Sequence, residues 1–459
     1  MRTPLVALGA LIFLSACAGP RPAPPDLAVP TPGQWRLGLD VAAGPDLSER
    51  GWSAFGDAGL TATVQEALAN NLDLALAAAR VEEARAQFNA ADAQKGPNLN
   101  GAGGGARQRA VNAFGQPTEQ TVSQTQLSIA YDADLFGRLR HATAASRANL
   151  LAARANQDAV RLAIAATAAN GYIGVVALKA RLSVLRQTIA ARQAALALAQ
   201  RRVGAGYAPT LDLRQAQVEL AAAEQAIPAI DLALARQENG LRLLLGRADG
   251  PLPTGADLQT MSVPSLPAGL PASLLRRRPD LAAAEDQVVA ADETLKSARA
   301  AFMPSLQLTA TAGQIDSTLL NNPVGVFSVG GSVLAPLFDS GRLAAQRDIA
   351  AARRQQAALN YRRAALTAFR EVEDGLAAVE ANDRQEVALS RQLTAAADAL
   401  RLASNRYRAG YSPFLEQIDA QRGLLASELA LVQARSDRLT ARVTLYQALG
   451  GGWAQRATP

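Results

Sequence analysis

Two carboxylates, Glu416 and Asp419, stand three positions apart near the C-terminal end of this 459-residue chain. They follow a Gly-Tyr-Ser-Pro turn and open an apolar-periodic segment, which predicts that they lie at the start of a helix, where the helix dipole favours acids. Residues three apart share a helix face, so both carboxylates can point the same way. Carboxylates gathered on one face repel one another and attract cations. The alternative is that Glu416 is an ordinary first-turn acid and Asp419 a solvated one.

Composition excludes most other site chemistry. The chain has one Cys and one His, which excludes thiolate or imidazole metal centres, disulfides and Cys–His catalysis. We therefore expect no metal site and no catalytic residue, and an enzymatic lipoprotein is the weakest interpretation because His141 has no companion cluster. The net charge of +6 comes from interspersed Arg and acidic residues, and aromatics are only 4%, so we expect no nucleic-acid partner. The nucleotide-binding loop Gly-x4-Gly-Lys-Ser/Thr is missing from the sequence, so any energy must come from a partner.

The single cysteine, Cys17, follows Leu14-Ser15-Ala16 at the end of an apolar run of about ten residues. That length suits a signal peptide and is too short to span a membrane. The segment resembles the bacterial lipoprotein box, in which cleavage leaves a lipidated cysteine as the first mature residue. We predict a signal peptide at 1–16 and a covalent lipid on Cys17, with no other cofactor. An ordinary signal peptide with an incidental cysteine is the alternative.

One segment of the chain occurs twice. Gly206, Tyr207 and Pro209 recur 204 positions later as Gly410, Tyr411 and Pro413. In both copies a long proline-free segment precedes the Gly-x-Pro break, and an apolar-periodic segment follows it, which predicts two long helical hairpins. Matches beyond the hairpins indicate duplication of a whole structural unit. We predict that the tips 203–211 and 409–415 contact a partner, because each is small, exposed and apolar; a simple tight turn is the alternative.

Each half is predicted to run helix, strand hairpin, long helix, tip, helix. Thr61 or Thr63 would cap the first helix, which extends from about Thr63 to Lys95. Residues 17–60 are predicted to hold the lipid anchor, a proline-rich tether and the start of an equatorial region, residues 251–278 an equatorial linker, and residues 451–459 a tail. The first repeat is predicted at 61–250, with a β-hairpin at 98–134, a long helix at 138–203 and a helix at 212–246. The second repeat is predicted at 279–450, with a β-hairpin at 305–337, a long helix at 341–408 and a helix at 415–449. Each long helix would measure on the order of 100 Å.

The strands indicate a membrane protein. Leu127, Ile129 and Tyr131 alternate with polar residues, and 305–311 shows the same alternation. Strands of about ten residues with one apolar and one polar face are typical of outer-membrane barrels. Four strands cannot close on themselves, and open sheet edges are not tolerated in lipid. The sequence therefore predicts a barrel completed by other copies of the chain, without fixing their number.

The chain resembles the TolC-like outer membrane factors, specifically their lipidated NodT-type branch. The resemblance covers about residues 52–452 and rests on the segments 131–138, 278–281 and 336–342 together with the two Gly-Tyr-x-Pro tips. It implies a mixed α+β membrane protein: a trimer with a twelve-stranded transmembrane β-barrel above a long α-helical barrel in the periplasm. A small mixed domain girdling the helices would use 26–60, 247–278 and the C-terminal tail.

The resemblance also implies roles for residues at the hairpin ends. It places the periplasmic constriction at Glu416 and Asp419, and gate-holding contacts at Asp212 and Tyr407. Where the family often has an arginine after the tip glycine, this chain has Ser412. An arginine latch would then come from one of three residues, Arg406, Arg408 or Arg422.

The expected function is a passive exit channel in the outer membrane, lipid-anchored and trimeric. Its expected partners are a periplasmic adaptor and an inner-membrane resistance-nodulation-division transporter, with the outer-membrane lipid around it. Polypeptide export through a type I system is one alternative. A lipidated periplasmic adaptor is another, although an adaptor would have a single hairpin between β-rich domains. The sequence does not identify the substrate.

Overall fold

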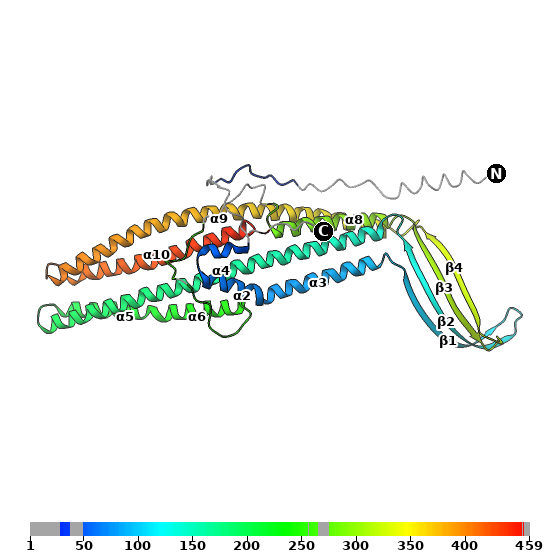
Figure 1. Ribbon diagram of the computed structural model, residues 1–459, viewed down its shortest axis with the longest axis horizontal. Coiled ribbons are helices and arrows are strands. Elements are labelled where there is room, and N and C mark those ends of the chain that lie inside the picture. The colour runs from blue at the N-terminus through cyan, green and yellow to red at the C-terminus, as the bar shows by residue number, and fades with distance from the viewer. Residues whose placement is uncertain (1–27, 37–48, 256, 265–274, 452, 454–459) are drawn as a thin grey trace. The chain divides into compact units, whose positions relative to one another are not determined.

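The computed structural model describes residues 28–36, 49–255, 257–264, 275–451 and 453 (Figure 1). The predicted signal peptide and Cys17 lie outside these residues. The described residues form two compact units: one contains residues 79–154 and 283–363, and the other contains residues 29–36, 49–78, 155–255, 257–264, 275–282 and 364–451.

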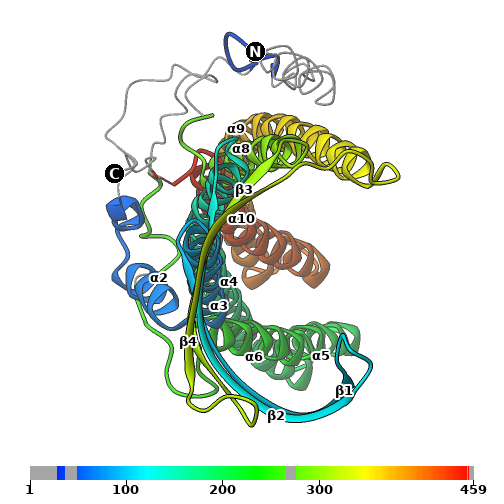
Figure 2. The ribbon, with the colours of Figure 1, turned by 90° about the vertical axis from the view of Figure 1, so that its right-hand side faces the viewer.

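The first unit contains one four-stranded antiparallel sheet in the order β1-β2-β3-β4. Its strands are β1 (Asn98–Val111), β2 (Pro117–Ala133), β3 (Ser305–Ser317) and β4 (Val324–Leu334). Each half of the chain supplies one hairpin, and the two hairpins join where β2 pairs with β3. Figure 2 shows the strands as one curved sheet. Among the described residues β1 and β4 each pair on one side only, so the sheet has two open edges.

The pairing register gives this sheet one apolar face and one polar face. Directly paired residues share a face, and such pairs include Leu99 with Ile129, Tyr131 with Leu308, and Leu306 with Val333. Near the helical ends of the strands, the apolar face includes Leu99, Leu127, Ile129, Tyr131, Leu306, Leu308, Ala310, Phe327, Val329 and Val333. The opposite face is mostly polar and includes Asn100, Gln124, Gln126, Ser128, Gln307, Thr309, Thr311, Ser328 and Ser332, although Val326 and Leu334 also lie on it. The predicted alternation is confirmed on β2 and β3, and β4 extends the apolar face.

The helices follow the duplicated order. They are α2 (Ala58–Asn70), α3 (Leu72–Ala93), α4 (Arg138–Gly204), α5 (Thr210–Glu224), α6 (Ala226–Leu244), α8 (Pro279–Ala300), α9 (Arg342–Arg408) and α10 (Phe414–Ala448), with a short 3-10 helix at Glu49–Phe55. Helices α4 and α9 have 67 residues each. Duplication has thus preserved the length of the longest element in both halves.

The first predicted helix is in fact two. Asp57 caps α2, its carboxylate accepting the Leu60 N–H at 2.7 Å. Asn71 then separates α2 from α3, and its side-chain oxygen accepts the N–H groups of Asp73 and Leu74. The predicted caps Thr61 and Thr63 lie inside α2, where each hydroxyl donates to the carbonyl four residues before it. Asp57 is the helix cap because its carboxylate reaches the free N–H groups of the first turn.

The segment 212–246 is also divided, into α5 and α6, at Gln225. Pro228 lies in the first turn of α6 and has no N–H to donate to the carbonyl four residues earlier. The equivalent segment in the second half contains no proline, and α10 runs unbroken from Phe414 to Ala448.

The second unit has an alanine-rich core between helices. Its largest cluster packs Trp52, Phe55 and Tyr446 against the buried face of α4, with the Trp52 and Tyr446 rings 4.9 Å apart. An 18-residue window of α4 is apolar enough by composition to cross a membrane, and 50% of that window is buried inside the protein. Small alanines on this face let neighbouring helices approach closely.

Candidate functional site

Two turns of the same conformation close the helical hairpins of the second unit. Gly206 has φ +74° and Gly410 has φ +81°, the left-handed region that favours glycine at a helix C-terminus. The matching hydrogen bonds run from the Tyr207 N–H to the Arg202 carbonyl at 2.8 Å and from the Tyr411 N–H to the Arg406 carbonyl at 2.9 Å. The duplication therefore extends to backbone detail.

Each turn presents an exposed tyrosine followed by a proline. Tyr207 and Tyr411 are among the most exposed large side chains of the chain. Pro209 and Pro413 hold extended backbone angles directly before α5 and α10, so the turns lead into new helices without a side-chain cap. Rigid turns that expose an aromatic ring suit contact with a partner; this role stays a prediction.

The structure brings the predicted pair Asp212 and Tyr407 together. The Tyr407 hydroxyl donates to the Asp212 carboxylate at 3.4 Å, a long hydrogen bond between the first hairpin and the second. The Tyr407 ring is buried against Phe414 at 5.0 Å. Burial raises the pKa of Tyr407 above its usual value, with the Arg202 guanidinium opposing that shift and the Asp212 carboxylate adding to it, so the hydroxyl keeps its proton. Whether this contact holds a gate is a prediction.

Arg202 is a functional candidate that sequence analysis missed. Its guanidinium donates to the carbonyl of Tyr407 at 2.9 Å and to that of Arg408 at 2.8 Å, and it lies 4.7 Å from the centre of the Tyr407 ring. These carbonyls belong to the last turn of α9, where the next helical N–H groups are missing and cations are favoured; the Tyr407 carbonyl also accepts the Gly410 N–H at 3.1 Å. An arginine from the first hairpin thus caps a helix of the second. Arg202 is equivalent to Arg406 in the repeat, and this equivalence could have identified it from the sequence.

A buried ion cluster lies further along the same hairpins. Arg192 of α4 and Glu219 of α5 are 5% and 6% exposed and 3.0 Å apart, and Arg422 of α10 donates to the same Glu219 carboxylate at 2.9 Å. Burial lowers the pKa of Arg192, Glu219 opposes that shift, and Arg422 adds to it. One carboxylate therefore joins three helices. Sequence analysis missed it, although Glu219 lies seven residues, about two turns, after Asp212 on the same face.

The arginines expected to form a latch do so only in part. Arg406 approaches Glu416 at 3.8 Å, and Arg422 approaches Asp419 at 3.8 Å while bonding more closely to Glu219. The carboxylates of Glu416 and Asp419 are exposed and weakly paired. In the described part of the chain no three potential metal-ligand side chains gather. The predicted constriction at Glu416 and Asp419 stays a prediction.

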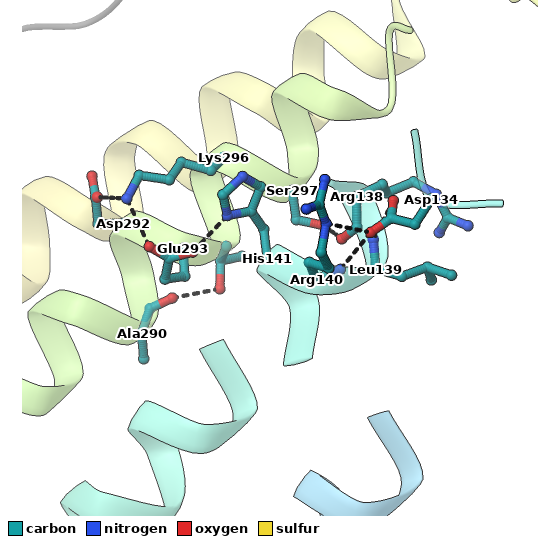
Figure 3. A network of polar contacts seen from close by, with 11 residues as sticks. Asp134, Arg138, Leu139, Arg140, His141, Ala290, Asp292, Glu293, Lys296 and Ser297 are labelled. Atoms are coloured by element: carbon teal, nitrogen blue, oxygen red, sulfur yellow. Dashed lines mark hydrogen bonds and ion pairs between the residues drawn. The ribbon is translucent and has the colours of Figure 1, made fainter. Parts of the chain in front are cut away.

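His141 belongs to a different network, in the first unit (Figure 3). Its Nδ1 lies 2.7 Å from the Glu293 carboxylate, which also accepts from Lys296 at 2.7 Å. Burial alone would raise the pKa of Glu293, but the hydrogen bonds from Lys296 and His141 lower it. The Ser297 hydroxyl donates to the carbonyl of Arg138 nearby. These contacts tie α4 to α8, which is a structural role for the histidine.

Comparison with known proteins gives consistent matches along the chain. Residues 63–247 and 270–451 match the family described as outer membrane efflux protein. The cation efflux system protein CusC of Escherichia coli O6:H1 is 35% identical over 436 residues, covering 93% of this chain and 94% of that protein. The pyoverdine export outer membrane protein OpmQ of Pseudomonas aeruginosa is 34% identical over 98% of this chain and 97% of its own.

Solved structures agree in fold. A crystal structure of CusC has a TM-score of 0.84 at 33% identity, covering 94% of this chain and 99% of that one. The open state of the MtrE outer membrane channel of Neisseria gonorrhoeae has a TM-score of 0.79 at 29% identity, covering 93% and 99%. Both likenesses thus cover more than nine-tenths of this chain.

Proposed function

This chain belongs to the outer membrane efflux protein family, and we propose that it is the exit channel of a tripartite efflux pump, passively conducting small molecules out of the cell. The observation that carries the proposal is the match of both repeats to this family, together with a sheet whose apolar face spans all four strands. The fold is that of a channel with a helical barrel and a β-barrel shared between protomers, four strands from each of three chains. Other copies thus complete the two open edges of the sheet.

The names of the relatives support a channel that selects little. They refer to cation efflux, pyoverdine export and toluene efflux, at 35%, 34% and 33% identity to this chain. Such different cargoes at nearly equal identity favour a channel that accepts what a transporter delivers. The substrate would then be chosen by that transporter.

The proposed partners are a transporter that supplies energy and an adaptor that contacts the hairpin tips. A passive channel needs an energised transporter in the inner membrane, for which a resistance-nodulation-division transporter is our first choice. A periplasmic adaptor would meet the exposed hairpin tips around Tyr207 and Tyr411. Membership of the channel family decides against the chain itself being the adaptor. Type I polypeptide secretion is distinguished by the cargo in the test below.

The gate would lie at the hairpin ends. In a trimer, Glu416 and Asp419 of each chain would place six carboxylates around one axis, and Asp212 with Tyr407 would hold adjacent hairpins together. Their exposure and loose pairing within one chain leave these acids free to line such an axis.

The proposal is tested by deleting the gene and measuring intracellular accumulation of a fluorescent pump substrate. We expect accumulation to rise, and the full chain to reverse it only when the adaptor and transporter are present. In planar bilayers the purified oligomer should form a pore. A monodisperse monomer with native strand content, or loss of a secreted polypeptide without change in small-molecule accumulation, would contradict the proposal.

We also propose that Cys17 carries the lipid. Cys17→Ser should abolish labelling with radioactive palmitate and shift signal processing, while insertion into the outer membrane survives because the strands also hold the protein there. Equal label in wild type and variant would show that the cysteine is incidental.

A further inference from the structure

A Leu-Phe pair stands at the strand-to-helix junction of each repeat, beyond the last strand residue of its hairpin. In the second repeat, Leu337 and Phe338 are 96% and 89% exposed. They follow β4 by two residues and precede Asp339, whose carboxylate caps α9 by accepting the N–H groups of Gly341 and Leu343. Two large apolar side chains held outward on an ordered turn indicate a surface that something covers.

The lipid-facing surface of the sheet is too short without them. On β2 the apolar face runs from Leu127 to Ala133, roughly 20 Å at 3.4 Å per residue. Outer-membrane barrels carry an apolar band about 25 Å tall, and strand tilt shortens the projected height further. Beyond Leu127 the same face continues with Thr125, Ser123 and Thr121, which are polar. At the opposite end of the sheet the apolar face of β4 continues to Val333, and Leu337 and Phe338 follow, so these two side chains can supply the missing height.

A cavity of about 350 Å³ adjoins this end of the sheet, and its charged lining residues are Asp132, Asp134, Arg138 and Arg342. Arg138 is tied to Asp132 at 2.7 Å, and the Asp134 carboxylate accepts backbone N–H groups at the start of α4. Arg342 is exposed and lies 3.9 Å from Asp339, whose oxygens are occupied in capping α9. The Arg342 guanidinium is thus placed to receive a further anionic group.

We infer that residues 337–342 form a docking site for a phospholipid of the periplasmic leaflet of the outer membrane. Leu337 and Phe338 enter the boundary between acyl chains and headgroups, where aromatic rings gather on membrane barrels. Arg342 binds the lipid phosphate at the mouth of the cavity, its stem along apolar surface and its charge in the headgroup layer. The site rests on the outer-membrane barrel and not on which pump the channel serves.

The depth of Phe338 provides the first test. Phe338→Trp is compared with Tyr411→Trp, which places the same ring at an equally open position (81% exposed) on a hairpin tip. Both trimers are reconstituted in liposomes of phospholipids brominated either close to the headgroup or near the chain end. We expect headgroup-proximal bromines to quench Phe338→Trp most strongly and to leave Tyr411→Trp unaffected. Equal, weak quenching of both variants would overturn the inference, whether water, an adaptor or a neighbouring protomer covers the ring.

Phosphate recognition is tested with Arg342→Gln. Its control is Arg370→Gln, an equally exposed arginine paired with Asp374 at 3.3 Å on the same helix. Phospholipid retained by the trimer is counted by native mass spectrometry after titration with defined lipid. We expect about fivefold weaker binding for Arg342→Gln, the effect of one cation at a membrane surface, and no change for the control. Equal retention would overturn the assignment. If the wild-type protein fails to complement efflux but still shows quenching and lipid retention, the proposed pump function is contradicted and the lipid site is not.

Discussion

The two hairpin ends share one backbone and differ in how they use charge. Both turns have a left-handed glycine, an exposed tyrosine and a proline before the next helix. At the first, Arg202 and Asp212 reach across to Tyr407 of the second hairpin. At the second, Glu416 and Asp419 are exposed, each 3.8 Å from an arginine. Duplication has preserved the turn, while the charges have diverged into holding contacts on one side and available carboxylates on the other.

The difference shows that position within the repeat does not determine role. Asp212 and Glu416 are equivalent in the duplication and both lie in the first turn of a helix. Only Asp212 meets a hydroxyl, because Tyr407 projects from α9 towards it, whereas the equivalent residue of the first hairpin is Val203, which has no hydroxyl. Changing the two kinds of acid should therefore have different consequences.

The largest effect is expected from the buried acid of the first hairpin. Glu219→Ala leaves the buried Arg192 guanidinium without its carboxylate and with only the backbone carbonyl of residue 219 as partner, which costs about 3 kcal/mol. Amide hydrogen exchange in α4 and α5 should accelerate strongly, and Arg422 should lose its link to α5. The control is Glu224→Ala, an exposed glutamate on the same helix, for which exchange should stay close to wild type. Similar exchange for both variants would mean that the cluster does not hold the hairpins.

An intermediate effect is expected from Arg202→Gln. It removes the charge from two hydrogen bonds and a cation–π contact, while the glutamine amide can keep one donor at this partly exposed site, so the net cost is about 2 kcal/mol and the hairpin ends should loosen. Single-channel conductance should rise, and more so than for Tyr407→Phe, which loses only a 3.4 Å hydrogen bond. The control is Arg201→Gln, the same substitution at the exposed neighbouring arginine. A larger effect of Tyr407→Phe would reverse the proposed ranking.

The smallest effect on stability is expected at the second hairpin. Glu416→Gln with Asp419→Asn removes exposed, loosely paired charges, so thermal stability should change by less than about 1 kcal/mol. Ion selectivity should nonetheless change: the preference for cations and block by divalent cations should both fall. Reversal-potential measurements across a salt gradient can establish this. Unchanged selectivity would show that these residues are only helix-start acids.

Periodicity and repetition predicted most of the architecture. Alternation at Leu127, Ile129 and Tyr131 predicted a two-faced strand, and the register extends that face across the sheet. The prediction was wrong at two places for local reasons. Asp57, and not Thr61 or Thr63, caps the first helix, and a helix predicted to be continuous is divided near Pro228. Such details depend on which group first reaches a free N–H, and a periodic pattern does not encode that.

The sequence by itself determined the duplicated frame, the two-faced strands and the turn conformation. These follow from local rules: glycine admits a positive φ, proline breaks a helix, and alternate strand residues share a face. Only the tertiary structure decided that Arg202 caps α9 and that Glu219 joins Arg192 to Arg422. These partners are distant in sequence. From the sequence alone, an arginine on a helix is predicted to be solvated, because the carbonyl or carboxylate that it contacts belongs to another helix. Long-range polar partners are set by how helices pack, and packing is what the repeat leaves unspecified.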